Sequence, residues 1–157
     1  MCDLSRNGYP RRVIRRAAAS DLPALLPLVA AFYEEDRHDY DEGRVLRALR
    51  PLLADDTHGQ VWVCDAGSRL SAYAVVTWSW SLESGGRDCI LDEIYVDPDS
   101  RGTGSALLET VLHAVAQAGA AAMFLETEAH NARVRGFYAR HGFDVEDSVW
   151  MSRPLGG

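Results

Sequence analysis

The sequence predicts an α/β protein of the α+β type, in which a mixed, mostly antiparallel and twisted sheet carries helices on both faces. Two observations favour this class. Short apolar runs with strand-like alternation recur along the chain, and between several of them apolar residues fall three or four positions apart, as on a helix. The predicted order is β-α-α-β-β-β-α-β-α-β, so hairpins of neighbouring strands precede strands that alternate with helices.

The N-terminal third of the chain predicts one strand and two helices. Residues 11–17 alternate in the manner of a strand. Ser20 is a typical helix cap, and Pro23 suits the first helical turn after it. Apolar residues at helical spacing then indicate one helix that extends to Phe32 and a second helix over residues 45–53.

The rest of the chain predicts five strands and two helices. Residues 60–80 indicate two strands joined by a turn at residues 66–68. The other predicted elements are strands over residues 88–96 and 121–128, helices over residues 104–118 and 131–142, and a final strand or hairpin over residues 143–153.

The length and composition are those of one globular domain. The chain has 157 residues, of which 47% are hydrophobic and 25% charged. We expect a loose N-terminal extension over residues 1–11 and a single domain over residues 12–157. No apolar run approaches the roughly 18–20 residues of a membrane span, and the N-terminus lacks a signal core, which predicts a cytoplasmic protein without membrane partners.

The charged residues exclude several functions. The net charge of -7 opposes nucleic-acid binding, and it suits either solubility or a cationic substrate. All 16 basic residues are arginine, which excludes a pyridoxal Schiff base, a lysine nucleophile and the P-loop lysine. The three cysteines are far apart and no Cys/His cluster has metal spacing, so we expect reduced thiols and no metal site.

The stretch VDPDSRGTGSALL, residues 96–108, has the character of an anion-binding loop. It leads from a strand through glycines into a helix, whose first N–H groups lack internal partners. Arg101 could add a charged donor. A dinucleotide site is rejected, because such a loop follows the first strand of its domain and this one follows an antiparallel hairpin in mid-chain.

A second motif, LETEAHNARVRGFYARHGF, covers residues 125–143. Asn131 caps a predicted helix, which carries Phe137 and Tyr138. The Arg-Gly-x-Gly loop together with this Asn, Phe-Tyr and Gly-Phe pattern resembles the GNAT-type N-acetyltransferase superfamily over residues 12–153. Residues 79–98 are also similar to a bacterial subgroup whose broader relatives include polyamine acetyltransferases.

The resemblance implies direct acetyl transfer from acetyl-CoA to an amine, and relatives are commonly dimers, which implies a possible homodimer. It places Asn131 near the cofactor or the substrate, and Tyr138 near the sulfur, where a tyrosine of reference pKa about 10 would be the acid. It assigns backbone contacts with the acetyl and pantetheine portions to Ile94, Tyr95 and Val96. It assigns the pyrophosphate to Arg101, Gly102, Thr103, Gly104, Ser105 and Ala106.

The loop fits the family pattern in two registers, because Pro98 is two residues closer to Leu107 and Leu108 than in relatives. One register keeps Arg101 in its usual place. The other keeps the helix in phase, so that Gly102 and Gly104 form the cradle and Arg101 is displaced toward the helix. We favour the second, because burial of the two leucines contributes roughly 1.5–3 kcal/mol each.

An amine of reference pKa about 10.4 arrives protonated, so a base has to accept its proton. Strict strand alternation places Asp92 on the side of Ile94 and Val96, and Glu93 on the opposite side with Tyr95. Asp92 is therefore the better candidate base, through a water molecule, and the resemblance agrees. Glu93, or water without any side chain, is the alternative, and a purely structural role for Asp92 is also open.

Substrate contacts are expected from acidic and aromatic residues. Glu34, Glu35 and Asp36 could form an acidic mouth with Asp92, although a solvated helix end explains any single one of them better. Trp78 and Trp80 share one face of a strand and either wall the pocket or pack in the core. Further candidates are Glu126 and Glu128, on one face of the strand over residues 121–128, and His130.

The sequence therefore predicts an N-acetyltransferase whose acceptor is a primary amine of a small cationic molecule, such as a polyamine, an amino sugar or an amino-acid derivative. One alternative is an enzyme that acetylates proteins or peptides. Another is a CoA-binding regulatory protein without activity.

Overall fold

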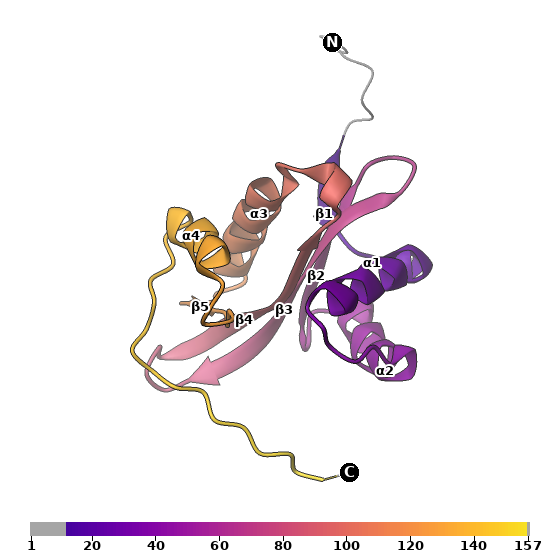
Figure 1. Ribbon diagram of the computed structural model, residues 1–157. Helices are drawn as coiled ribbons and strands as arrows, with labels where there is room; N and C mark the ends of the chain where they lie inside the picture. Colours follow the sequence, from indigo (N-terminus) through magenta and orange to yellow (C-terminus); the bar gives the residue numbers. More distant parts are fainter. Residues whose placement is uncertain (1–11, 157) are drawn as a thin grey trace. The chain divides into compact units, whose positions relative to one another are not determined.

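The computed structural model describes residues 12–156 (Figure 1). These residues form two compact units, the larger ending at Leu125 and the smaller beginning at Glu126. The extension expected over residues 1–11 lies outside the described residues. Between residues 12 and 156, none of the helices combines the length and the apolar character that a membrane crossing requires.

A five-stranded sheet with the order β1-β2-β3-β4-β5 forms the larger unit. Neighbouring strands are antiparallel except for β4 and β5, which run parallel. The predicted mixed, mostly antiparallel sheet is thereby confirmed. The strands are β1 (Val13–Arg16), β2 (Gly59–Asp65), β3 (Leu70–Ser81), β4 (Gly86–Val96) and β5 (Met123–Phe124).

Helices cover both faces of this sheet, as predicted. Helices α1 (Leu22–Glu35) and α2 (Glu42–Ala54) lie on one face, and α3 (Thr103–Gln117) lies on the other (Figure 1). The main core fills the space between the sheet and α1 and α2, where Leu25, Val63 and Tyr73 are fully buried. The opposite layer is formed by the apolar stripe of α3.

The expected cap of the first helix is wrong. Ser20 lies in a short 3-10 helix, η1 (Ala19–Asp21), and α1 begins after Asp21 with Pro23 in its first turn. The Asp21 carboxylate accepts hydrogen bonds from Arg15 at 2.8 Å and from the Ala18 backbone N–H at 2.7 Å. Asp21 therefore fixes the entry into α1, because an ion pair and a backbone bond hold its side chain.

The smaller unit contains one helix, α4 (Ala132–Arg140). The Asn131 side chain accepts a hydrogen bond from the Val134 N–H at 3.1 Å, so the predicted cap is confirmed. The final strand or hairpin expected over residues 143–153 is wrong, because these residues form no strand. Most of their apolar side chains lack a partner strand and stay exposed, with Val149 87% and Met151 91% accessible.

The strand expected over residues 121–128 is also shorter than predicted. Only Met123 and Phe124 pair with β4, opposite Cys89 and Ile90. Glu126 and Glu128 therefore do not share a strand face, and both side chains are exposed. The parallel pairing ends at Ile90, just before β4 becomes irregular.

Candidate functional site

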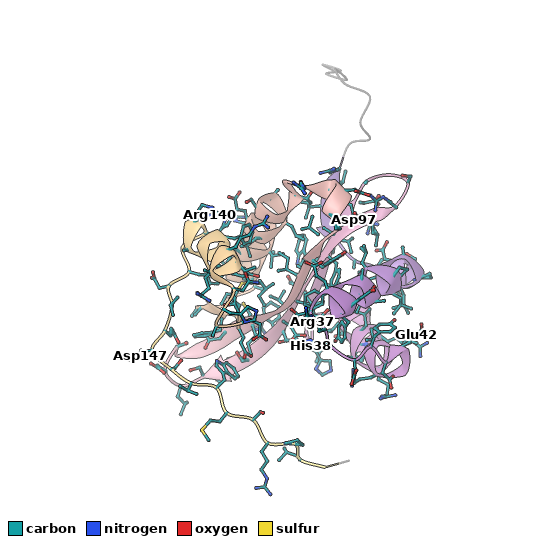
Figure 2. The ribbon with its side chains drawn as sticks, in the orientation of Figure 1. Arg37, His38, Glu42, Asp97, Arg140 and Asp147 are labelled. Carbon is teal, nitrogen blue, oxygen red and sulfur yellow. The ribbon has the colours of Figure 1, made fainter. Side chains whose placement is uncertain are left out.

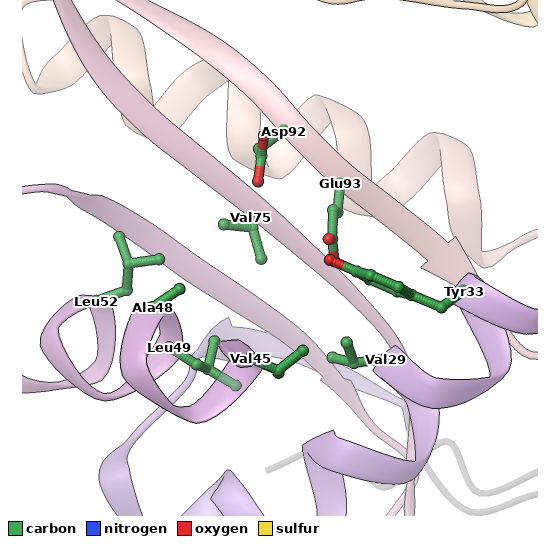
Figure 3. A pocket seen from close by; sticks show the side chains of 9 residues that line it. All are labelled: Val29, Tyr33, Val45, Ala48, Leu49, Leu52, Val75, Asp92 and Glu93. Atoms are coloured by element: carbon green, nitrogen blue, oxygen red, sulfur yellow. The ribbon is translucent and has the colours of Figure 1, made fainter. Parts of the chain in front are cut away.

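Strand β4 contains a β-bulge at Asp92. Glu93 stands opposite Val75 on β3, and Leu91 stands opposite Val76, so Asp92 has no partner in the ladder. A bulge inserts one extra residue and thereby breaks the alternation of side chains. The expectation that Asp92 and Glu93 face opposite sides of the sheet is therefore wrong, since both line the same pocket (Figure 3).

The pocket lies between β4, the neighbouring strand β3 and the two helices on that face of the sheet. Its volume is about 90 Å³. The two carboxylates come from the β4 side, and helix α2 supplies the wall at the lower left of Figure 3. The lining consists of Val29, Tyr33, Val45, Ala48, Leu49, Leu52, Val75, Asp92 and Glu93.

Two tyrosines hold the carboxylate of Glu93. Tyr73, fully buried on β3, donates its hydroxyl hydrogen to Glu93 Oε2 at 2.8 Å, and Tyr33 on α1 also hydrogen-bonds to this side chain. Burial raises the pKa of Glu93, and the two tyrosine hydrogen bonds offset only part of the rise. Burial and the charge of Glu93 raise the pKa of Tyr33 to about 12. Both tyrosines therefore stay protonated and act as donors.

Asp92 is in a different environment. The residue is exposed at the mouth, while its carboxyl points into the pocket (Figure 3). Within residues 12–156 its carboxyl makes no hydrogen bond or ion pair. The loss of hydration in the pocket raises its pKa. Asp92 is thus the carboxylate of the pair that remains available for a ligand or a proton.

Among the described residues, the edge of β4 that follows the bulge has unpaired backbone N–H and C=O groups. On one side Ile94, Tyr95 and Val96 pair with β3. On the other side the pairing with β5 ends at Ile90, so in the described part of the chain residues 91–96 have no strand partner on that edge. Unpaired strand N–H and C=O groups are a template for an extended ligand. This edge suits the pantetheine chain of a CoA thioester, whose amides hydrogen-bond in the manner of a peptide.

The predicted phosphate loop leads from β4 into α3. A 3-10 helix, η2 (Pro98–Ser100), precedes Gly102, which has a left-handed φ of 85° and forms the N-cap of α3. Leu107 and Leu108 are fully buried, as the favoured register requires. The helix therefore presents its first N–H groups next to the strand end, where they can bind an anion.

The residues of this loop differ in their surroundings. Thr103 is nearly buried, and its hydroxyl accepts a hydrogen bond from Arg12 at 2.8 Å. Arg101 is exposed, and Gly104, Ser105 and Ala106 belong to the first turn of α3. Sequence reasoning missed Arg12, which no motif includes, because its contact with α3 spans most of the chain.

Several residues predicted to bind substrate do not line the pocket. Glu34 and Glu35 are exposed at the end of α1, and from their segment Tyr33 reaches the pocket instead. The Trp78 indole donates to the Asp56 carbonyl at 2.7 Å and stacks under Arg87. The other substrate-binding candidates are exposed. Trp80 on β3 is 77% exposed, and the exposed set also includes Asp36, Glu126, Glu128 and His130.

Tyr138 lies on α4 in the smaller unit. Its ring makes edge contacts with Phe137 and Phe143, at centroid distances of 5.2 Å and 5.6 Å. Burial raises its pKa to about 12. The phenol therefore keeps its proton at any physiological pH, which a proton donor requires, although it is a weaker acid than a free tyrosine.

The fold and the strand-to-helix loop have counterparts among known proteins. The model of the acetyltransferase (GNAT) family matches residues 22–143, which is most of the chain. The protein therefore belongs to the GNAT acetyltransferase family. This membership confirms the resemblance inferred from the two sequence motifs.

Individual relatives agree with this assignment. The chain is 27% identical over 135 residues to the uncharacterized N-acetyltransferase YhfO of Bacillus subtilis, a match that covers 85% of this chain and 90% of that protein. The crystal structure of the integron cassette protein HFX_CASS3, from the mobile metagenome of Cole Harbour Salt Marsh, is 29% identical with a TM-score of 0.80 and covers 92% of this chain and 91% of that chain.

A third relative has a known ligand. The aminoglycoside acetyltransferase meta-AAC0020 from an uncultured soil metagenomic sample, crystallised with sisomicin, is 17% identical with a TM-score of 0.74. The match covers 92% of this chain and 97% of that chain. At this identity the likeness is one of fold alone.

Proposed function

We propose that the protein transfers the acetyl group of acetyl-CoA directly to a primary amine of a small cationic molecule. The observation that carries this proposal is the pair of carboxylates that the bulge in β4 turns into one pocket. The pocket adjoins the unpaired edge of β4, so an amine held by the carboxylates would lie close to a thioester bound along that edge.

The chain offers a fitting site for acetyl-CoA. The open strand edge over residues 91–96 suits the pantetheine amides, and the N-terminus of α3 after Gly102 suits the pyrophosphate. The left-handed backbone at Gly102 forms the turn into this helix. When bound, the cofactor supplies an activated acetyl thioester. Backbone groups of the protein bind the cofactor, and the proton-transfer roles belong to side chains.

The two carboxylates have different roles in this proposal. An alkylammonium ion is attracted by their negative charge, but the amine has to lose a proton before it can attack a carbonyl. Asp92 accepts that proton, because its carboxyl has no other partner in the described chain and its raised pKa makes it a stronger base than an ordinary aspartate. Glu93 is held by Tyr73 and Tyr33 and positions the ammonium group.

Tyr138 is proposed as the proton donor to the departing thiolate. Its pKa of about 12 keeps it protonated, and a thiol of reference pKa about 8.5 is a good leaving group with modest assistance. Asn131 uses its side-chain oxygen to cap α4, so its proposed contribution is to fix the start of the helix that carries Tyr138.

The direct test is thiol release from acetyl-CoA by the purified protein across a panel of primary amines and peptides, combined with the thermal shift that acetyl-CoA induces. We expect a thermal shift and turnover with small amines. Turnover with peptides alone would favour a protein acetyltransferase, and a shift without any turnover would favour a regulatory protein. Absence of both would refute the proposal.

The absence of lysine sharpens this test. The sequence contains no lysine, so the enzyme has no lysine side chain of its own to acetylate during the assay. Any acetyl-lysine detected in a peptide experiment therefore belongs to the added peptide and not to the enzyme. Mass spectrometry of the peptide and of the protein separates the two directly.

A further inference from the structure

The pocket beside Asp92 has one polar wall and is otherwise apolar. Apart from the two carboxylates and Tyr33, all its lining side chains are aliphatic. Five of the aliphatic residues are at most 8% exposed, namely Val29, Val45, Leu49, Leu52 and Val75. The Tyr33 hydroxyl is engaged by Glu93, so it offers little to a second polar group. The lining therefore suits a ligand that carries one cation and an apolar body.

We propose that the acceptor is a monoamine whose amino group is attached to a compact branched or linear alkyl group. This inference rests on the proposed acetyl transfer to amines and restricts it to one class of acceptor. The ammonium group lies between Asp92 and Glu93 at the β4 wall. The alkyl group enters the pocket and packs against the aliphatic side chains of α2.

The size of the pocket limits the alkyl group. An apolar cavity of roughly 150 Å³ holds one benzene molecule. The pocket volume of about 90 Å³ is smaller in proportion, so it admits an alkyl group of about four carbon atoms. The remaining atoms of a slightly longer alkyl chain would lie at the open mouth of the pocket. Isopentylamine and n-pentylamine are therefore suitable probes.

A diamine fits this pocket poorly. If its second ammonium group entered the pocket, it would stand against Leu49 and Leu52, far from any countercharge on that wall. Burial of an unpaired charge is strongly unfavourable. If the second group pointed outward to the exposed Glu34 and Glu35, the apolar pocket would stay empty and its contribution to binding would be lost. A diamine is therefore expected to bind less well than a monoamine in either orientation of its second ammonium group.

An amino alcohol or amino sugar meets a similar penalty. A hydroxyl that loses its hydration without gaining a hydrogen bond weakens binding. The α2 wall, formed by Val45, Ala48, Leu49 and Leu52, has no side-chain donor or acceptor. The acceptor class inferred here therefore excludes polyamines and amino sugars, which the sequence left open.

The test compares kcat/KM for n-pentylamine, isopentylamine, 1,4-diaminobutane and 4-amino-1-butanol, which are of similar length and differ in the terminal group. We expect the two alkylamines to exceed the diamine and the amino alcohol by about tenfold or more. If the diamine or the amino alcohol were used as well as the alkylamines, the inference would fail while the proposed acetyl transfer would stand. If no amine were acetylated, both would fail.

A pair of variants at one position locates the alkyl group. Ala48→Leu adds bulk to the pocket from α2, so we expect kcat/KM to fall by about tenfold for isopentylamine and by clearly less for methylamine, which has no alkyl body to place. Ala48→Asp adds a carboxylate to the apolar wall, and we expect it to shift the preference toward 1,4-diaminobutane. The matched control is Ala116→Leu, on the exposed side of α3. Equal effects of Ala48→Leu on both amines would place the alkyl group elsewhere.

Discussion

Tyr73 on β3 donates a hydrogen bond of 2.8 Å to Glu93 on β4, diagonally across the two strands. This bond occurs in the buried layer beneath α1 and fixes the carboxylate that the bulge turns into the pocket. It separates the roles of two neighbouring acids, since Glu93 is held by tyrosines and Asp92 beside it is not. The site therefore combines a fixed negative charge with an available base.

Tyr73→Phe is expected to destabilise the protein by about 1.5–3 kcal/mol, the usual contribution of a hydrogen bond to a charged group. The variant keeps the ring in the core and removes only the donor. Urea denaturation at pH 7 measures the change. Tyr40→Phe, at an exposed position after α1, is the control and should stay within about 0.5 kcal/mol of the wild type. A loss no greater than that of the control would show that the bond contributes little.

The raised pKa values of Asp92 and Glu93 predict a pH dependence of stability. A carboxyl whose pKa is higher in the folded state binds more protons there, so its contribution to stability is present below its unfolded pKa of about 4 and is lost as the pH rises through the folded pKa. We expect Asp92→Asn to gain stability relative to the wild type between pH 4 and pH 7. Urea titrations at several pH values measure this difference.

The exposed Asp147→Asn is the matched control for that experiment, and its side chain stands on the segment after α4 (Figure 2). This control shows how far the loss of one exposed carboxylate alone changes the pH profile. A pH-dependent difference for Asp92→Asn no greater than that of the control would mean that Asp92 titrates as it does in the unfolded chain.

Two glycines at the start of α3 should respond in opposite ways to alanine. Gly102 has a left-handed φ of 85°, so Gly102→Ala should lower stability by about 1–2 kcal/mol. Gly104 lies inside the helix, where alanine is preferred by about 0.5–1 kcal/mol. Thermal unfolding without cofactor measures both. A stabilising Gly102→Ala would contradict the described turn.

Tyr138→Phe should lower kcat more than it weakens acetyl-CoA binding, because the proposed role is proton donation. The pKa of about 12 further predicts that no alkaline limb from this residue appears below about pH 11. The dependence of kcat on pH tests the proton-donor role, and the thermal shift induced by acetyl-CoA tests cofactor binding. An unchanged kcat would remove Tyr138 from the chemistry.

Local patterns were sufficient for much of the fold. The helical spacing of Leu107 and Leu108 predicted a buried stripe, and Asn131 before α4 predicted a cap, because both features depend on residues within one or two turns. Family membership followed from the two motifs taken together. The sheet class followed from the order of the elements.

The errors arose where distant residues decide the structure. The prediction that Asp92 and Glu93 face opposite sides of the sheet required a regular strand ladder in β4. The register with β3 instead places a bulge at Asp92 and brings both acids to one pocket. Tyr73 lies in an apolar strand, and no neighbouring residue in the sequence indicates that its hydroxyl donates a hydrogen bond to Glu93. Residues 143–153 have strand-like composition, but a strand requires a partner that the pattern does not specify.

The measurement that tests the central claim most directly is the rate of acetyl transfer by Asp92→Asn and the wild type at pH 7 and near pH 10, with the best amine of the panel. If Asp92 accepts the proton of the amine, the variant should be slower by about 10²–10⁴ at pH 7. The deficit should shrink near pH 10, where the amine loses its proton unaided. A variant as fast as the wild type at pH 7, or a deficit that stays constant with pH, would contradict the claim.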